Sequence, residues 1–220
     1  MKVSLVDYGR GNLGSVRKAF EHVGAEVEVI SAPAQVDRAE ALVLPGQGAF
    51  KDCMLTLDRG GLSSALRKYL ASGRPYLGLC LGLQILFEWS EEHGGAEGLG
   101  VLKGKVRRFP VDLKDVSGNP LKVPHMGWNG VRFPSQEPFF AGIPEETAFY
   151  FVHSYYVDPT DSKVACGRTD YGIDFVSAIR SGPWIATQFH PEKSQRAGLA
   201  LISNFYREAQ GKKSKEARTA

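Results

Sequence analysis

The chain has 220 residues, of which 43% are hydrophobic, and a formal net charge of +3. This length allows one large α/β domain with a substantial core. The three cysteines are an odd number without metal-ligand spacing, which argues against a disulfide framework and a zinc site. No apolar run approaches the length of a membrane span, so we expect a cytoplasmic protein.

The excess positive charge lies at the C-terminus. Residues 211–220 contain four basic side chains and one acidic side chain, which together carry the whole net charge of +3. The rest of the chain is near neutral and gives little support to nucleic-acid binding. We expect residues 1–209 to form a single domain and residues 210–220 to form a basic, disordered tail.

The first half of the chain alternates between predicted strands and helices. Short apolar runs predict strands over Lys2 to Asp7, Val27 to Ile30 and Ala41 to Leu44. Helical spacing predicts helices over Ser15 to Val23 and Leu62 to Leu70. This alternation is typical of right-handed βαβ units on a parallel sheet.

A glycine-rich loop follows the first predicted strand. Gly9, Gly11 and Gly14 have the Gly-x-Gly-x-x-Gly spacing of dinucleotide-binding folds. Such a fold would place an acidic residue at the end of the second strand, but Ser31 stands there, although Glu28 is nearby. We therefore interpret the glycines as a tight loop that could face a partner.

A second glycine-rich loop, Pro45 to Phe50, follows the third predicted strand. Ligands bind at the carboxyl ends of strands in open parallel sheets. The amides of Gly46, Gln47 and Gly48 would be free there to turn toward an oxyanion. An ordinary turn is the alternative, and this loop alone does not decide between them.

The segment from Arg74 to Glu88 predicts a nucleophile. A short apolar strand passes without a linker into residues with helical spacing, and Cys80 lies at the joint. The order Gly-Leu-Cys-Leu-Gly around Cys80 has the form of a nucleophile elbow, whose glycines let strand and helix approach closely. Free amides and the helix dipole there would favour the thiolate. The alternative is a small cysteine buried for packing.

After Gly100 the pattern changes to short strands with little helix between them. The runs are Gly104 to Phe109, Gly130 to Phe133, Ala148 to Val152, Val164 to Thr169, Phe175 to Arg180 and Trp184 to Phe189. Ser181-Gly182-Pro183 predicts a hairpin turn between the last two. The second half therefore adds antiparallel strands, and an apolar stripe predicts a final helix from Gln195 to Ala209.

A cysteine nucleophile needs a general base whose orientation is fixed. The five candidates are His22, His93, His125, His153 and His190. The first two lie on an amphipathic helix and in a Glu/Gly-rich turn, so we expect them to be structural or exposed, whereas His125 and His153 remain candidates. His190 is best placed, because it follows a strand and begins His-Pro-Glu. Glu192 can then hold the imidazole, which completes a Cys80, His190 and Glu192 triad.

Gly-Leu-Cys-Leu-Gly-Leu-Gln with a distant His-Pro-Glu resembles the triad (class I) glutamine amidotransferases. Further segments narrow the resemblance to the glutaminase subunit of imidazole glycerol phosphate synthase, from histidine biosynthesis. They are Asp7 to Asn12, Pro45 to Phe50, Pro124 to Asn129, Phe151 to Tyr155 and His190 to Ser194. The resemblance implies a flavodoxin-like α/β fold with a central, mostly parallel sheet flanked by helices and additional antiparallel strands in the second half.

The resemblance also implies a mechanism. Cys80 attacks the side-chain amide of L-glutamine, and His190, oriented by Glu192, takes the thiol proton and then protonates the leaving ammonia. Water hydrolyses the thioester to glutamate. The Leu81 amide and an amide of the Gly46, Gln47 and Gly48 loop would hold the oxyanion, and in this family that loop must often reorient first. Substrate-binding residues by resemblance are Gln84, Glu92, Ser154 and Tyr155.

A partner is expected, because ammonia released into neutral water is mostly protonated and no longer a nucleophile. By resemblance the partner is a TIM-barrel cyclase subunit in a heterodimer, which forms imidazole glycerol phosphate and aminoimidazole carboxamide ribotide. The expected contacts are Asn12, Met126, Trp128, Asn129 and Lys193, since Trp and Met are enriched at interfaces. A packed corner of the second sheet is the alternative for Met126, Trp128, Asn129 and Lys193, and for Met126 the two interpretations are about even. No metal or organic cofactor is expected.

Other classes of protein stay open. A stand-alone cysteine hydrolase would share the triad without needing the Met126 to Asn129 and Lys193 features. A non-catalytic interaction protein would be expected to have lost a triad residue. Among glutaminases, the subunit of pyridoxal phosphate synthase is the main alternative, and the Pro124 to Asn129 segment argues against it.

Overall fold

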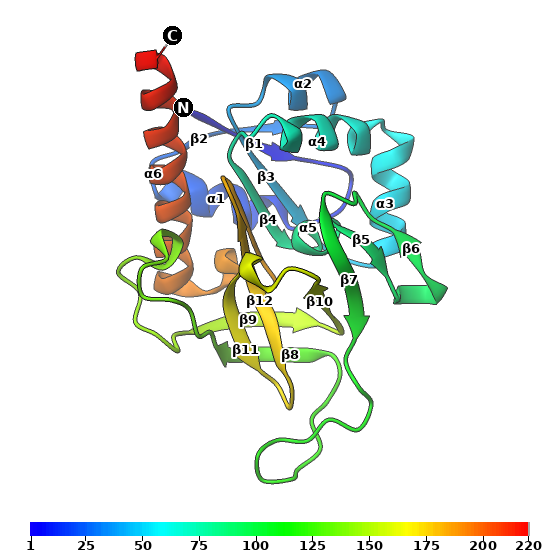
Figure 1. Cartoon of the computed structure of the whole chain (residues 1–220). Helices are drawn as coiled ribbons and strands as arrows, with labels where there is room; N and C mark the ends of the chain where they lie inside the picture. Colours follow the sequence, from blue (N-terminus) through cyan, green and yellow to red (C-terminus); the bar gives the residue numbers. More distant parts are fainter. Residues whose placement is uncertain (220) are drawn as a thin grey trace.

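The computed structural model describes the backbone of residues 1–219 and the side chains of residues 1–211. Its centre, in the part of the chain described, is an 11-stranded sheet in the order β2-β1-β3-β4-β13-β12-β10-β7-β5-β6, with β11 paired to β12 (Figure 1). A two-stranded sheet, β8-β9, lies beside it. The prediction of a mixed α/β fold is therefore confirmed.

The strands of the parallel half and the hairpin that extends it are β1 (Lys2–Val6), β2 (Glu26–Ile30), β3 (Ala41–Gly46), β4 (Tyr76–Cys80), β12 (Asp174–Ser181) and β13 (Trp184–Thr187). The others are β5 (Phe87–Ser90), β6 (Ala96–Glu97), β7 (Leu102–Arg108), β8 (His125–Gly130), β9 (Ala148–His153), β10 (Tyr155–Pro159) and β11 (Ala165–Asp170). The helices are α1 (Leu13–His22), α2 (Pro33–Arg38), α3 (Phe50–Arg59), α4 (Leu62–Ala71), α5 (Leu81–Gln84) and α6 (Gln195–Thr219).

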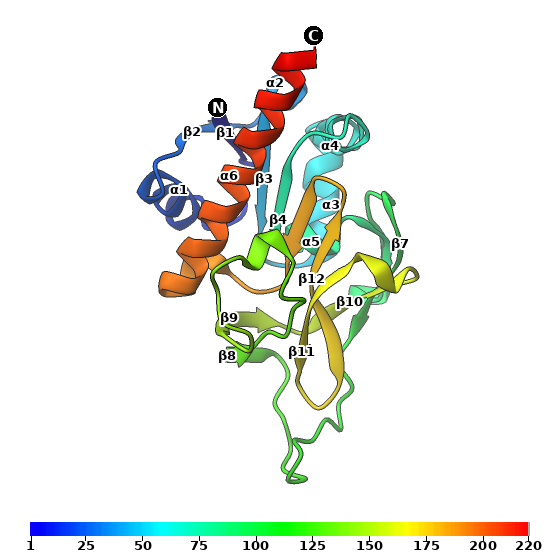
Figure 2. The same ribbon diagram turned by 60° about the vertical axis from the view of Figure 1, so that its left-hand side comes forward.

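Five neighbouring strands, from β2 to β13, run parallel. Every residue of β3 and β4 is buried, as expected for central parallel strands that are covered on both faces. The helices α1 and α6 pack on one face of these strands, and α2, α3 and α4 pack on the other (Figures 1 and 2). The carboxyl ends of the parallel strands therefore share one edge of the layered core.

The hairpin between β12 and β13 joins the parallel half to the antiparallel half. Ser181 pairs with Trp184 across the predicted turn, so the hairpin prediction is confirmed. From β12 the sheet continues through β10 and β7 by antiparallel pairing. This places β13, which precedes His190, directly beside β4, which ends in Cys80.

Several predicted elements were wrong in extent or missed. The helix after Cys80 has only four residues, because Ile85, Leu86 and Phe87 are buried on all sides and the chain turns into β5. The strand expected over Gly130 to Phe133 lies earlier, at β8. The sequence interpretation missed α2, α3 and β10.

The last helix begins at Gln195 as predicted but continues to Thr219, beyond the end of its apolar stripe. The expected end at Ala209 is therefore wrong. The prediction that residues 210–220 are disordered concerns residues whose side chains lie mostly outside the described part of the chain. It therefore stays a prediction.

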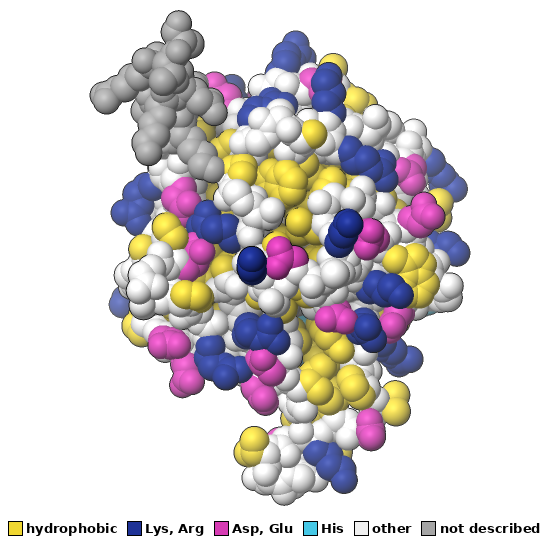
Figure 3. Space-filling view, in the orientation of Figure 1, with side chains coloured by type: hydrophobic (Ala, Val, Ile, Leu, Met, Phe, Trp, Pro, Cys, Tyr) yellow, Lys and Arg dark blue, Asp and Glu magenta, His cyan; other side chains and the backbone are white. Residues whose placement is uncertain are grey.

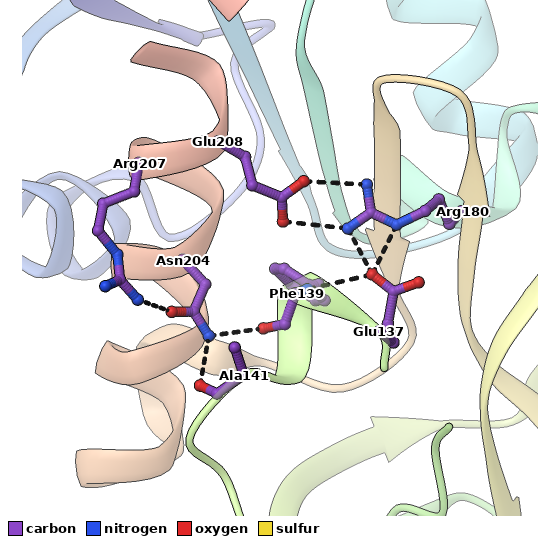
Figure 4. A network of polar contacts seen from close by, with 7 residues as sticks. All are labelled: Glu137, Phe139, Ala141, Arg180, Asn204, Arg207 and Glu208. Carbon is purple, nitrogen blue, oxygen red and sulfur yellow. Dashed lines mark hydrogen bonds and ion pairs between the residues drawn. The ribbon is translucent and has the colours of Figure 1, made fainter. Parts of the chain in front are cut away.

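A polar network attaches α6 to the antiparallel part of the molecule (Figure 4). The guanidinium of Arg180 on β12 donates to both carboxylate oxygens of Glu208 at 3.1 Å and from Nε to Glu137 at 2.6 Å. Asn204 donates to the carbonyls of Phe139 and Ala141, each at 2.9 Å. These bonds tie one helix to two separate parts of the second half.

Candidate active site

The backbone at Cys80 is strained. Its φ of 54° and ψ of −104° place a non-glycine residue at positive φ, where the joint between β4 and α5 turns sharply. A Cβ at Gly78 would lie 2.4 Å from the Gly82 carbonyl oxygen, and one at Gly82 would lie 2.0 Å from the Leu44 carbonyl oxygen. Only glycine fits these two positions, which gives the turn the geometry of a nucleophile elbow.

The helix dipole contributes less at Cys80 than the sequence suggested. The macrodipole is a sum over aligned peptide units, and α5 contains four residues. The amides of its first turn still lack partners within the helix. Local amides are therefore the main source of positive potential that this helix offers the sulfur.

His190 lies at the same edge of the sheet as Cys80. Because β13 runs parallel to β4, with Thr187 opposite Leu79, the chain leaving β13 reaches the cysteine. The Nδ1 of His190 is 2.8 Å from the carboxylate of Glu192, and both side chains are buried, at 3% and 2% exposure. The predicted base and its orienting carboxylate are thus in contact.

The electrostatics of this pair favour the imidazolium form. Burial alone would lower the pKa of His190, but interactions with Cys80 and Glu192 outweigh it and raise the pKa to about 10. The ring's Nε2 is buried and has no hydrogen bond of standard geometry within the described residues. A cationic ring beside the sulfur would stabilise a negative charge there and could supply a proton.

Gln188 also contacts the nucleophile, and the sequence interpretation missed it. Its Nε2 is 3.5 Å from the sulfur of Cys80, and its Oε1 accepts from Gln84 Nε2 at 3.0 Å. The side chain is fully buried. The available signal was a polar residue at the end of an apolar strand, two positions before the histidine.

A cavity of about 400 Å³ opens over these groups. Most of the predicted catalytic, oxyanion and substrate residues line it. Its lining is Gln47, Gly48, Cys80, Leu81, Gln84, Glu92, Pro124, Val152, His153, Ser154, Tyr155, His190 and Lys193. Glu192 lies behind His190, and Gly46 lies beneath Leu81, where a Cβ would be 2.4 Å from the leucine Cβ.

Two polar side chains of the cavity wall, Gln84 and Glu92, are held by hydrogen bonds to the backbone. Gln84 is nearly buried and donates to the Tyr155 carbonyl at 3.1 Å. One carboxylate oxygen of Glu92 accepts from the Phe50 amide at 2.6 Å, and the side chain is 14% exposed. A fixed carboxylate in the cavity wall could bind an α-ammonium group.

The predicted partner residues fall into two groups. Met126 and Trp128 on β8 are 65% and 49% exposed, so the packed-corner alternative for Met126 is wrong. Met126 lies opposite Val152, which lines the cavity, and Lys193 Nζ lies 5.6 Å from the Tyr150 ring that Trp128 also contacts. These residues form one surface at the cavity's border, which we call the β8 face.

Asn12 and Asn129 make contacts within the subunit. Asn12 caps α1, where its side chain accepts from the Ser15 amide at 3.3 Å. Asn129 is half-buried, donates to the Asp170 carbonyl at 2.8 Å and lies 3.3 Å from the His125 Nε2. Contact of these two residues with a partner remains a prediction.

Within the residues the structure describes, no cluster of three or more His, Cys, Asp or Glu side chains could hold a metal ion. Over the same residues, no helix combines the length and apolar character needed to cross a bilayer.

A strained cysteine, a buried histidine–glutamate pair and a cavity at the carboxyl edge of a parallel sheet are the geometry expected of a class of cysteine-dependent enzyme. The family model for glutamine amidotransferase class-I matches residues 4–209, and the chain belongs to this family. Within the family, it is similar to curated proteins named imidazole glycerol phosphate synthase subunit HisH. The relative from Syntrophotalea carbinolica is 49% identical over 203 residues, covering 92% of this chain and 98% of the relative. The relative from Aromatoleum aromaticum is 51% identical over 207 residues, covering 92% and 96%.

Solved structures share the fold at low sequence identity. A structure described as a glutamine amidotransferase matches with a TM-score of 0.72 and 18% identity, over 96% of this chain and all of that one. PurLQS from Thermotoga maritima matches with a TM-score of 0.69 and 18% identity, over 94% and 98%. These likenesses confirm the predicted fold class.

We predict that acid destabilises the protein through His125 and His153. Burial lowers the pKa of His125 to about 4. Burial is also the largest cause that lowers the pKa of His153, to about 3. In the unfolded chain both histidines have a pKa of about 6.5. Their contribution to stability is complete above pH 6.5 and is lost as the pH falls toward these folded values. Urea unfolding at pH 7, 6 and 5 should show a loss for each histidine that is small between pH 7 and 6 and approaches about 1.4 kcal/mol per pH unit below pH 6.

The double variant His125→Phe/His153→Phe should flatten this pH dependence. Replacement of the exposed His22 by glutamine is the matched control and should leave it unchanged. An equally steep acid loss in the double variant would contradict the prediction.

Proposed function

We propose that this chain is the glutaminase subunit of an imidazole glycerol phosphate synthase. It hydrolyses L-glutamine to glutamate and passes the ammonia to a cyclase subunit. The observation that carries the proposal is Cys80, at a strained elbow beside the His190–Glu192 pair in one cavity, in a chain about half identical to HisH subunits.

Acylation begins with the Cys80 sulfur, deprotonated toward His190, attacking the side-chain carbonyl carbon of glutamine. The negative charge that develops on the carbonyl oxygen would be stabilised by the Leu81 amide and by one amide from the Gly46 to Gly48 loop. Each such donor contributes roughly 3 to 4 kcal/mol in other enzymes. His190 then gives its proton to the leaving nitrogen, and ammonia departs from a γ-glutamyl thioester.

Deacylation reverses the proton transfers. Water attacks the thioester carbonyl, His190 accepts a proton from it, and the sulfur leaves as glutamate forms. Glu192 holds Nδ1 of the ring through the 2.8 Å contact, so that Nε2 faces the reacting atoms throughout.

Substrate selection would rest on both ends of the glutamine. Glu92 is placed to bind the α-ammonium group, and backbone and side-chain groups of Gln84, Ser154 and Tyr155 surround the rest of the amino-acid end. A cavity of about 400 Å³ suits a ligand of this size.

The β8 face is the proposed docking surface for the cyclase subunit. Met126 and Trp128 are exposed apolar side chains next to the cavity, and covering them would shield ammonia from solvent. Apart from the β8 face, Figure 3 shows a further group of hydrophobic side chains in the lower part of the molecule, above the loop that projects there. The acceptor reaction in the partner would yield imidazole glycerol phosphate and aminoimidazole carboxamide ribotide, in the cytoplasm.

The test is glutamate release from glutamine, measured for the chain alone and then with the cyclase subunit and its nucleotide ligand. Low activity alone that rises strongly in the complex supports the proposal. Strong activity that is indifferent to the cyclase would instead indicate a stand-alone cysteine hydrolase or the glutaminase of another synthase.

We predict that Trp128→Ala weakens association with the cyclase subunit by about 30-fold in Kd, or roughly 2 kcal/mol, as for a buried aromatic anchor. Titration calorimetry would measure this. Val29→Ala is the control, because Val29 is also an exposed apolar residue (43%) but lies on the edge strand β2. Equal affinities of the Trp128 variant and the unmodified chain would remove the β8 face from the interface.

A further inference from the structure

Two buried histidines lie in contact next to the cavity and have no part in the mechanism above. His125 on β8 is opposite His153 on β9, and the His125 Nδ1 is 3.0 Å from the His153 Nε2. Both side chains are buried, at 3% and 6% exposure. His153 lines the cavity, while His125 lies behind it and stacks on Tyr171 at 3.9 Å between ring centres.

The contacts fix which nitrogen of each ring carries the proton. The Nδ1 of His153 is 2.8 Å from the Tyr155 carbonyl oxygen, which can only accept, so this nitrogen must donate. In the neutral ring Nε2 is then the acceptor and receives a hydrogen from His125 Nδ1. The remaining nitrogen of His125 accepts from the Asn129 amide, at 3.3 Å. The Tyr155 carbonyl at one end and the Asn129 amide at the other therefore fix the donor and acceptor roles of all four imidazole nitrogens.

The same carbonyl connects the histidines to the nucleophile. The Tyr155 oxygen also accepts from Gln84 Nε2 at 3.1 Å, and that amide donates in addition to Gln188 Oε1 at 3.0 Å. Gln188 Nε2 lies 3.5 Å from the sulfur of Cys80. A continuous set of hydrogen bonds thus runs from Asn129 through both histidines to the reacting sulfur.

We propose that His153, supported by His125, is a positioning residue for glutamine hydrolysis: it holds the Tyr155 carbonyl, which orients Gln84 and Gln188 against Cys80. This inference rests on the proposed function. Neither imidazole takes up a proton in the reaction. Each acts only as a neutral Nδ1–H tautomer.

The surroundings of the pair keep both rings neutral. The side chains packed around the two imidazoles are aromatic: Phe109, Phe151, Tyr171 and Phe175. The titratable groups that face His153 are His125 and His190, and a cation on either would oppose its protonation. If His153 were protonated, its Nε2–H would point at the Nδ1–H of His125. Two donors would then face each other, and the hydrogen bond between the two rings would be lost.

The first test is the tautomeric state, read from the ¹⁵N shifts of the imidazole nitrogens in the full chain at pH 7. We expect both His125 and His153 to be neutral and protonated at Nδ1. An Nε2–H tautomer or an imidazolium at His153 would overturn the proposal without any variant being made.

The second test separates kcat from KM. His153→Phe keeps the ring shape but removes both hydrogen bonds, and we expect kcat to fall roughly 10- to 100-fold with a smaller change in KM. His153→Asn keeps an amide donor near the Nδ1 position and should recover part of kcat. Tyr171→Phe is the control, because it keeps the ring stacked on His125, removes only a hydroxyl that donates to the Lys122 carbonyl, and should leave kcat unchanged.

The outcomes are distinguishable. Full activity in folded His153→Phe, or no recovery in His153→Asn, would refute the positioning role while leaving the glutaminase assignment intact. Absence of glutaminase activity in the unmodified chain with its cyclase partner would instead refute the proposed function. Should His153→Phe fail to fold, the Asn variant and the tautomer measurement still decide.

Discussion

Replacing Cys80 with alanine is expected to lower kcat for glutamine hydrolysis by at least about 10⁴-fold, as for other enzymes that lose their nucleophile. The reason is geometric as well as chemical. The sulfur lies on a backbone at φ 54°, in the cavity that His190 also lines, and no other cysteine lines that cavity. Glutamate release, measured in the complex with the cyclase subunit, is the appropriate assay because the proposed function predicts the highest activity there.

Cys166→Ala is the matched control for this variant. Cys166 is also a buried, free cysteine, but it lies on β11 and outside the active-site cavity. Its loss should leave kcat within a few-fold of the unmodified chain. Turnover that survives in Cys80→Ala would exclude the thioester mechanism, whatever the control shows.

Gly82→Ala is expected to destabilise the protein by about 3 kcal/mol or more. The added Cβ would lie 2.0 Å from the carbonyl oxygen of Leu44, which belongs to the buried strand β3. Leu44 is paired with Gly78 on β4, so neither strand can move away without breaking the central pairing. Denaturant unfolding monitored by fluorescence and circular dichroism would measure the loss.

Gly14→Ala tests the same substitution where space exists. A Cβ at Gly14 would meet nothing within 4 Å, and this residue lies inside α1 at ordinary helical φ. Alanine there should be neutral or stabilise by up to about 1 kcal/mol. If both variants unfold at the same denaturant concentration as the unmodified chain, the close packing at the elbow is not real.

The parallel half and the triad could be predicted because their signals are local. The continuous apolar runs of β3 and β4, the glycines around Cys80 and the His-Pro-Glu sequence are each visible within a few residues. Helices and strands that depend on contacts with residues far away in the sequence were missed or misplaced. The chain after Gln84 has an apolar spacing typical of a helix, but pairing with β7 makes Phe87–Ser90 a strand.

The site was predicted where side chains do the chemistry and less well where they support it. Gln188 shows no motif of its own, and its contact with Cys80 arises only because β13 lies beside β4. The His125–His153 contact similarly depends on the register of β8 and β9, which are far apart in the sequence. Asn129 was assigned to the partner from its neighbours, and its hydrogen bonds to Asp170 and His125 within the subunit were not foreseen.

The position of β13 has a consequence for biosynthesis on the ribosome. This strand is among the last to be translated, yet it occupies the middle of the sheet, between β4 and β12. Until it emerges, the wholly apolar strand Tyr76–Cys80 has one unpaired edge, which can pair with other nascent chains. A truncated chain that ends before Trp184 should therefore aggregate and depend on chaperones, although it contains the nucleophile and most of the core.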